Sequence, residues 1–121
     1  MGGFFIDDVI RTIARNVRRE VRRRGAAKWP VAVGKVSRFR TTDGDWHGLR
    51  PIIDYEYEVN GRIEYGSATG FSTNKDINPI GDAVDALGEL RIRFDPADPS
   101  INRFLGEDNP KVPFEIDHEV S

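Results

Sequence analysis

The sequence of 121 residues contains no cysteine, and it has only two histidines. The missing cysteine excludes disulfides, thiolate metal sites and thiol nucleophiles. No apolar run approaches the roughly 18 residues that a membrane span needs. Asp7 and Asp8 interrupt the short apolar start at Phe4, Phe5 and Ile6, so we expect no signal peptide. These absences predict a cytoplasmic protein, with peripheral attachment at a membrane as the other option.

The recognisable catalytic motifs are missing as well. The sequence has no nucleophile elbow, phosphate loop, dinucleotide fingerprint or histidine-based zinc motif. With two histidines and no cysteine, general-base and covalent catalysis have few candidate side chains. We therefore expect a protein that is not an enzyme and that holds no cofactor and no metal.

One short run has residue types that bind metals. Asp43, Asp45 and His47 alternate in a stretch rich in turn residues. A metal site needs three or four converging ligands, however, and no calcium-loop spacing follows. A solvated loop is the favoured interpretation. His118, between Asp117 and Glu119 near the end of the chain, is interpreted in the same way.

Charge is divided unevenly along the chain. Residues 1–28 hold eight basic and three acidic residues, a net charge of +5. The remaining 93 residues hold ten basic and seventeen acidic ones, a net charge of −7. A basic arm on an acidic body predicts two working parts, or one part that docks on the other.

Residues 4–24 have the pattern of one amphipathic helix. Ile6, Ile10, Ile13, Val17 and Val21 form a single apolar stripe at helical spacing. Gly25 is a natural stop. The opposite side is basic and is the predicted interaction face, made of Arg11, Arg15, Arg18, Arg19, Arg22 and Arg23.

From residue 29 the chain reads as mostly β. Strands are predicted over 31–39, 53–59, 62–71 and 90–94, and Asn60-Gly61 is a strong hairpin signal. A three-residue loop, 59–61, would oppose Tyr57 to Ile63 and Tyr55 to Tyr65, with all four side chains inside. We therefore predict that register rather than the two-residue loop.

The second half adds a helix, a turn and a tail. Asn78-Pro79 predicts a helix start, with Ile80, Val84 and Leu87 as the apolar face and Gly88 as the end. Asp95-Pro96 begins a rigid double turn that runs to residue 99. Residues 107–121 form a polar tail, in which 112–116 could add an edge strand.

The predicted fold is α+β, mostly β. We expect a small antiparallel β-barrel or roll with one helix between strands 3 and 4, preceded by the N-terminal amphipathic helix. Residues 1–28 are the basic helix and its connection, 29–106 the β-rich domain, and 107–121 the tail.

Paired acids follow one strand of the hairpin. Asp54, Glu56 and Glu58, with Glu64 across the turn, could serve hydrolysis if their surroundings separated their pKa values. Alternation places them on the outer, solvated face, which argues against catalysis. Asp95 and Asp98 are interpreted as turn formers.

Residues 29–106 carry a series of short motifs in a fixed order. They are Trp29-Pro30, Gly34-Lys-Val36, Tyr55-Glu-Tyr57-Glu-Val59-Asn60-Gly61, Tyr65-Gly66, Gly88, Leu90-Arg-Ile92 and Phe94-Asp95-Pro96-Ala-Asp-Pro99. In these motifs the chain resembles the bacterial family known as domain of unknown function 3592. The resemblance implies a compact β domain without known activity, often beside transmembrane helices, and it transfers no catalytic or binding residue. Here the basic helix stands where such proteins often have a membrane helix.

Together these observations predict a non-enzymatic binding or structural module whose N-terminal helix docks elsewhere. The surface could be its own domain, a second copy in a homo-oligomer, or an anionic membrane. The alternative is a small nucleic-acid-binding barrel that uses the arginine-rich helix. Acidic Asp54, Glu56 and Glu58 would repel phosphates, so nucleic acid is the less favoured partner.

Overall fold

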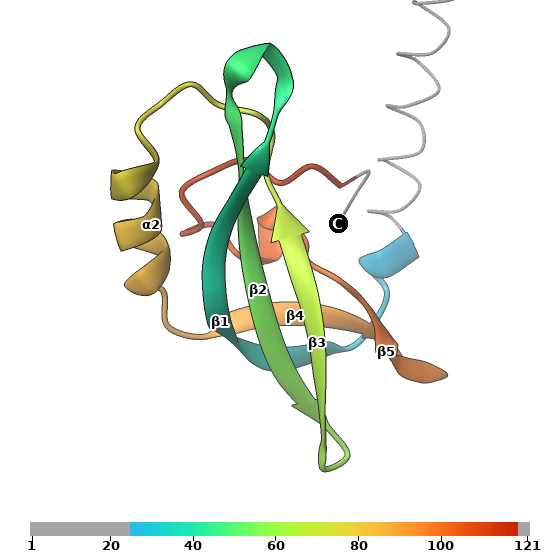
Figure 1. Ribbon diagram of the computed structural model, residues 1–121. Helices are drawn as coiled ribbons and strands as arrows, with labels where there is room; N and C mark the ends of the chain where they lie inside the picture. Colours follow the sequence, from blue (N-terminus) through green and yellow to red (C-terminus); the bar gives the residue numbers. More distant parts are fainter. Residues whose placement is uncertain (1–24, 119–121) are drawn as a thin grey trace, which may run out of the picture.

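The computed structural model describes residues 25–118 (Figure 1). The helix predicted over 4–24, with its arginine face, lies outside these residues. One antiparallel sheet has the strand order β3-β2-β1-β4-β5, and one α-helix lies between its third and fourth strands. In chain order the elements are β1 (Val31–Asp43), η1 (Asp45–His47), β2 (Leu49–Val59), β3 (Arg62–Thr69), α2 (Ile77–Asp85), β4 (Leu90–Asp95), β5 (Asp98–Arg103) and η2 (Gly106–Asp108).

The sheet curls until it is nearly a closed barrel, which confirms the mostly β prediction in its broad form. The curl depends on β1, because Gly34 pairs with Tyr57 of β2 on one side and with Leu90 of β4 on the other. A Cβ at Gly34 would lie 2.9 Å from both the Glu56 carbonyl oxygen and Ile92 Cγ1. Only glycine therefore fits where the three strands meet.

The core lies inside this curl and is dominated by aromatic and branched side chains. Tyr55 packs on Phe104, with ring centroids 5.5 Å apart. Val84 of α2 is fully buried against the barrel. Tyr55 and Tyr57 point inward as predicted, and the other buried side chains of β2 and β4 include Ile53, Leu90 and Ile92.

The predicted hairpin register is wrong by one residue. Val59 pairs with Arg62, Tyr57 with Glu64 and Tyr55 with Gly66. The loop is therefore the two-residue turn Asn60-Gly61, with φ values of 53° and 79°. Positive φ at both positions is the signature of a type I′ turn.

The reason for this register lies inside the barrel. The Tyr55 hydroxyl reaches across β3 to donate to Asn102 Oδ1 of β5, and the Tyr57 hydroxyl donates to the Pro99 carbonyl oxygen at 2.6 Å. A Cβ at Gly66 would collide with the Tyr55 ring and with Asn102. The inner face of β3 must therefore be small at this position, and Ile63 and Tyr65 turn outward. Glu64, which we expected on the outer face, lies opposite Tyr57 on the inner one.

Three further elements differ from the predictions. The strand β5 was not foreseen, because Asp98 and Pro99 at its start read as turn residues. The helix α2 begins before Asn78, since Asp76 is the N-cap and its carboxylate accepts the Asn78 N–H at 3.0 Å. Residues 112–116 contribute a single bridge, Gly70 to Ile116, rather than an edge strand.

Candidate functional site

Asp54 of β2 is surrounded by hydrogen-bond donors, two of them arginines. Asp54 accepts hydrogen bonds from Arg40 Nε at 2.8 Å, Ser67 Oγ at 2.6 Å and Arg38 Nη2 at 3.1 Å. Burial alone would raise the pKa of Asp54, but these three donors outweigh it and lower that pKa. A general acid needs the opposite shift.

The loop of Asp43, Asp45 and His47 does not form a ligand cluster. Across residues 25–118, no three Asp, Glu or His side chains gather closely enough to hold a metal ion. The loop is closed by the Gly44 N–H, which donates to the Gly48 carbonyl at 2.9 Å. Its distinctive feature is Trp46, which is 90% exposed at a φ of 57°.

The remaining polar candidates have local partners. Asp95 accepts the Ala97 N–H at 2.9 Å, and Asp98 accepts both the N–H and the hydroxyl of Ser100. The Ser100 bonds lower the pKa of Asp98. His118 Nε2 accepts the Gly106 N–H at 3.3 Å. These contacts hold turns and the C-terminal segment in place.

The residues that we expect to have structural roles, from Trp29 to Pro96, are distributed over the barrel. Trp29 precedes β1, and its carbonyl accepts a hydrogen bond from Arg93 Nη1 at 2.8 Å. Tyr55 and Tyr57 lie in the core, and burial raises the pKa of both hydroxyls. Asn60 and Gly61 form the hairpin turn, and Asp95 and Pro96 the turn between β4 and β5.

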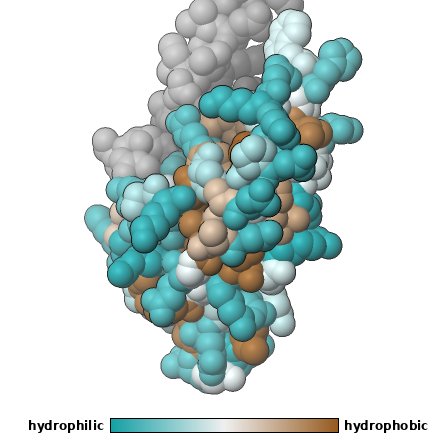
Figure 2. All heavy atoms as spheres, turned by 90° about the vertical axis from the view of Figure 1, so that its left-hand side faces the viewer, coloured by the Kyte–Doolittle hydropathy of each residue, from teal (hydrophilic) through white to brown (hydrophobic). Residues whose placement is uncertain are grey.

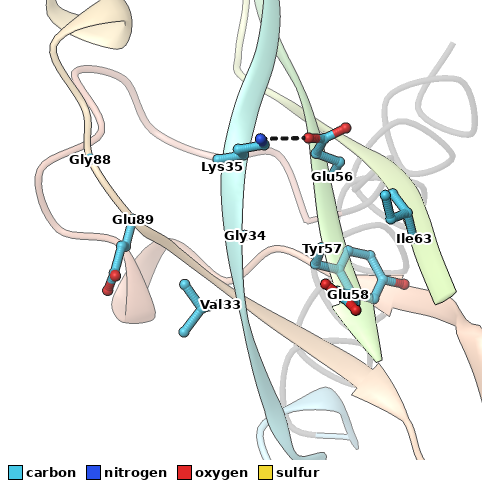
Figure 3. Close-up of a pocket in the computed structure, with 9 residues that line it drawn as sticks. All are labelled: Val33, Gly34, Lys35, Glu56, Tyr57, Glu58, Ile63, Gly88 and Glu89. Atoms are coloured by element: carbon cyan, nitrogen blue, oxygen red, sulfur yellow. Dashed lines mark ion pairs between the residues drawn. The ribbon is translucent and has the colours of Figure 1, made fainter. Parts of the chain in front are cut away.

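A groove of about 450 Å³ lies on the outer face of the barrel (Figure 3). It runs over β1, β2 and β3 near the hairpin turn and reaches the loop between α2 and β4. We call it the outer groove. Its lining residues are Val33, Gly34, Lys35, Glu56, Tyr57, Glu58, Ile63, Gly88 and Glu89.

The outer groove exposes bulky apolar side chains. Val33 is 61% exposed and Ile63 is 56% exposed, although both belong to strands. Tyr65 lies beside the groove, paired with Glu56 across β2 and β3, and is 67% exposed. Strand faces of this kind usually carry polar residues or are covered. The face that carries α2, seen in Figure 2, is mostly hydrophilic with separate hydrophobic patches.

The charge around these apolar residues is negative. Lys35 Nζ pairs with Glu56 at 3.1 Å. The other two carboxylates of the groove belong to Glu58 and Glu89. Within residues 25–118, neither of these two glutamates takes part in an ion pair. The groove therefore combines an apolar floor with a net charge of −2, a combination that fits a ligand both apolar and cationic.

Sequence reasoning identified Glu56 and Glu58 here but missed Val33, Ile63 and Tyr65. The signal was the alternation of β3 itself, where Ile63 and Tyr65 alternate with Glu64 and Gly66. The expected register places Ile63 and Tyr65 in the core, because a strand usually has a single buried face. The correct register assigns them to a second, outer surface.

The chain was also compared with known proteins. No helix within residues 25–118 is long and apolar enough to cross a membrane. No protein-family model matches the sequence, and no curated protein or solved structure matches it.

Proposed function

We propose that this protein is a non-enzymatic binding module whose outer groove receives the basic segment, residues 4–24. The single observation that carries the proposal is the composition of the groove. Val33 and Ile63 are more than half exposed, and they lie among glutamates with no cationic partner in the described part of the chain. Such a surface fits a ligand that covers the apolar side chains and neutralises the glutamates.

The sequence of the basic segment has the complementary composition. Its apolar stripe, from Ile6 to Val21, matches the floor of the groove, while the arginines on its opposite side give the segment a charge opposite to that of the groove. Residues 25–118 carry eleven basic and sixteen acidic groups, so the segment meets a body of opposite net charge. Opposite charge speeds encounter and fixes orientation, while apolar burial supplies affinity.

The proposal agrees with the resemblance of residues 29–106 to the family of unknown function 3592, since that family has no established activity. Membership in it stays a prediction. The agreement concerns only the kind of domain, a compact β domain.

Hydrogen exchange on the full chain tests this function. We expect slow exchange of the backbone amides in residues 4–24, and at least tenfold faster exchange when Glu58→Lys and Glu89→Lys are combined. The control is Asp82→Lys with Glu115→Lys, which makes the same change in net charge at two exposed positions outside the groove. Equal exchange rates in the two double variants would contradict the proposal.

A second candidate is a nucleic-acid-binding barrel. One observation favours it: five-stranded, partly open barrels bind oligonucleotides on the face of strands 2 and 3, and Tyr65 offers an exposed ring on that face. The carboxylates of Glu56 and Glu58 oppose it. Fluorescence polarisation with short single-stranded DNA tests it. Binding should weaken steeply with salt and disappear when Arg15, Arg18 and Arg22 become glutamate.

A further inference from the structure

We propose that the protein has a second binding site, for a carboxylate with an apolar body, in a hollow between the start of β4 and the segment after β5. The hollow has a volume of about 400 Å³, which is within the usual range of small-molecule sites. We call it the C-terminal hollow. It is formed by described residues alone, and its chemistry is independent of what occupies the outer groove.

Two cations line the C-terminal hollow. They are Arg91 of β4 and Lys111 of the segment that follows η2. Within residues 25–118 neither side chain takes part in an ion pair. Both residues are exposed, so their charges are available to a ligand in the hollow.

The acidic side chains of the hollow leave it a net charge of +1. Asp108 is neutralised by Arg93, whose Nε and Nη2 atoms donate to its two carboxylate oxygens at 2.9 and 3.0 Å. Glu89 is the remaining carboxylate of the lining. Two unpaired cations and one unpaired carboxylate sum to +1, so a monoanion balances the charge of the site, whereas a dianion such as a phosphate monoester would exceed it.

The floor of the C-terminal hollow is apolar. Leu90 is 1% exposed, and Leu87 and Val112 are half-buried against the core. A hydrocarbon chain in the hollow can cover the half-buried side chains while the charged end of the same ligand reaches the cations. An arginine fork binds a planar carboxylate through two parallel hydrogen bonds, so Arg91 favours a carboxylate as the charged end.

The two walls of the hollow are held together by a buried asparagine. Asn109 is 8% exposed, and its Oδ1 atom accepts the Arg91 N–H at 2.9 Å. Its Nδ2 atom donates to the Arg91 and Leu105 carbonyls at 2.9 and 3.1 Å. The backbone that carries Arg91 is thus fixed to the segment that carries Lys111. The site exists before a ligand binds, which reduces the entropy cost of binding.

The C-terminal hollow and the outer groove meet, but their charges are opposite. Gly88 and Glu89 line both of them. The outer groove fits an apolar cation, whereas the C-terminal hollow fits an apolar anion. A pair of ligands that share one hydrocarbon chain and differ in the sign of their charge therefore distinguishes the two sites.

Octanoate and octylamine are such a pair. In proton–nitrogen NMR spectra of the full chain, we expect octanoate at millimolar concentration to shift the amide signals of Leu90 and Val112 in a saturable manner. Octylamine at the same concentration should leave these two signals in place. Equal shifts with both ligands, or no saturable shift with octanoate, would overturn the proposal.

Removal of the two cations gives the second test. Arg91→Gln combined with Lys111→Gln should weaken octanoate binding about tenfold, since the charge-assisted contacts are lost. The matched control is Lys28→Gln with Lys75→Gln, which removes two positive charges at exposed positions outside the hollow and should keep the original affinity. Lys111→Gln alone should weaken binding about threefold, and it serves if the double variant does not fold. Unchanged octanoate affinity in the folded variants would mean that apolar contact alone holds the chain, and the proposed carboxylate site is then wrong.

Discussion

The two faces of the β2–β3 hairpin use tyrosine in opposite ways. On the inner face, Tyr55 and Tyr57 are 1% and 2% exposed, and both hydroxyls have partners on or beside β5. On the outer face, Tyr65 is 67% exposed and lies beside Ile63. The inner face contributes to the core, whereas the outer face exposes apolar side chains of the kind usually found in a core. A strand can therefore have its bulky apolar side chains on the outer face of a barrel.

The largest contrast should come from two isoleucines. Ile53→Ala removes buried methyl groups at a fully enclosed position and should lower the free energy of unfolding by about 3 kcal/mol. Ile63→Ala, at a position 56% exposed within residues 25–118, should cost at most about 1 kcal/mol, since only contacts with the docked segment are lost. Urea unfolding at low protein concentration measures both. Similar losses would mean that β3 is turned the other way.

A smaller contrast is expected from two glycines. Gly66→Ala places a methyl group against Tyr55 and Asn102, and overpacking of this kind costs about 1–3 kcal/mol. Gly88→Ala is the matched control, since nothing lies within 4 Å of the added carbon. Its unfolding midpoint should stay close to that of the unchanged protein. If Gly66→Ala were equally neutral, the tyrosine would not cross β3 at this point.

The tyrosine hydroxyls give the next contrast. Tyr55→Phe leaves Asn102 Oδ1 without its donor and should cost about 1 kcal/mol, whereas Tyr65→Phe should be nearly neutral. Burial raises the pKa of Tyr55, so the unfolded chain ionises first, and the stability that the neutral hydroxyl confers is lost above pH about 10. The deficit of Tyr55→Phe should therefore shrink in alkaline solution. A deficit that does not change with pH would contradict this.

The smallest effect concerns the outer-face carboxylate of Asp54. The pKa of Asp54 is lowered, so its contribution to stability is present above the unfolded value near pH 4 and is lost as the solution becomes more acidic. Arg38 and Arg40 are 68% and 41% exposed, so Asp54→Asn should cost less than about 1 kcal/mol at neutral pH. Its stability should also fall less between pH 5 and pH 2 than that of the unchanged protein. Asp82→Asn, on the exposed side of α2, is the control for the loss of one negative charge.

The sequence alone allowed a good prediction of the elements with strong periodicity. Strict alternation placed Tyr55 and Tyr57 inside, Asn60-Gly61 located the turn, and Val84 identified the buried face of α2. In each case a local pattern agrees with the tertiary environment. The helix between the third and fourth strands was foreseen for the same reason.

The errors arose where two local readings compete and only distant contacts decide. The hairpin register depends on Asn102, which lies 47 residues after Tyr55 and leaves room only for glycine at position 66. Asp98 and Pro99 have the composition of a turn, yet they begin β5 at the edge of the sheet, where a missing N–H is tolerated. The outer groove was missed as a consequence, since its apolar floor depends on the register.

The seam between β3 and β5 has a consequence for the order of folding. Within the described residues these two strands are not neighbours in the hydrogen-bonded sheet order, and Asn102 Nδ2 binds the Tyr65 carbonyl across the gap at 3.2 Å. The contacts that close the barrel are thus a few side-chain bonds between positions at least 37 residues apart. Such distant contacts form late. We therefore expect β5 to be the last strand to join the sheet during refolding and the first to detach under mechanical load.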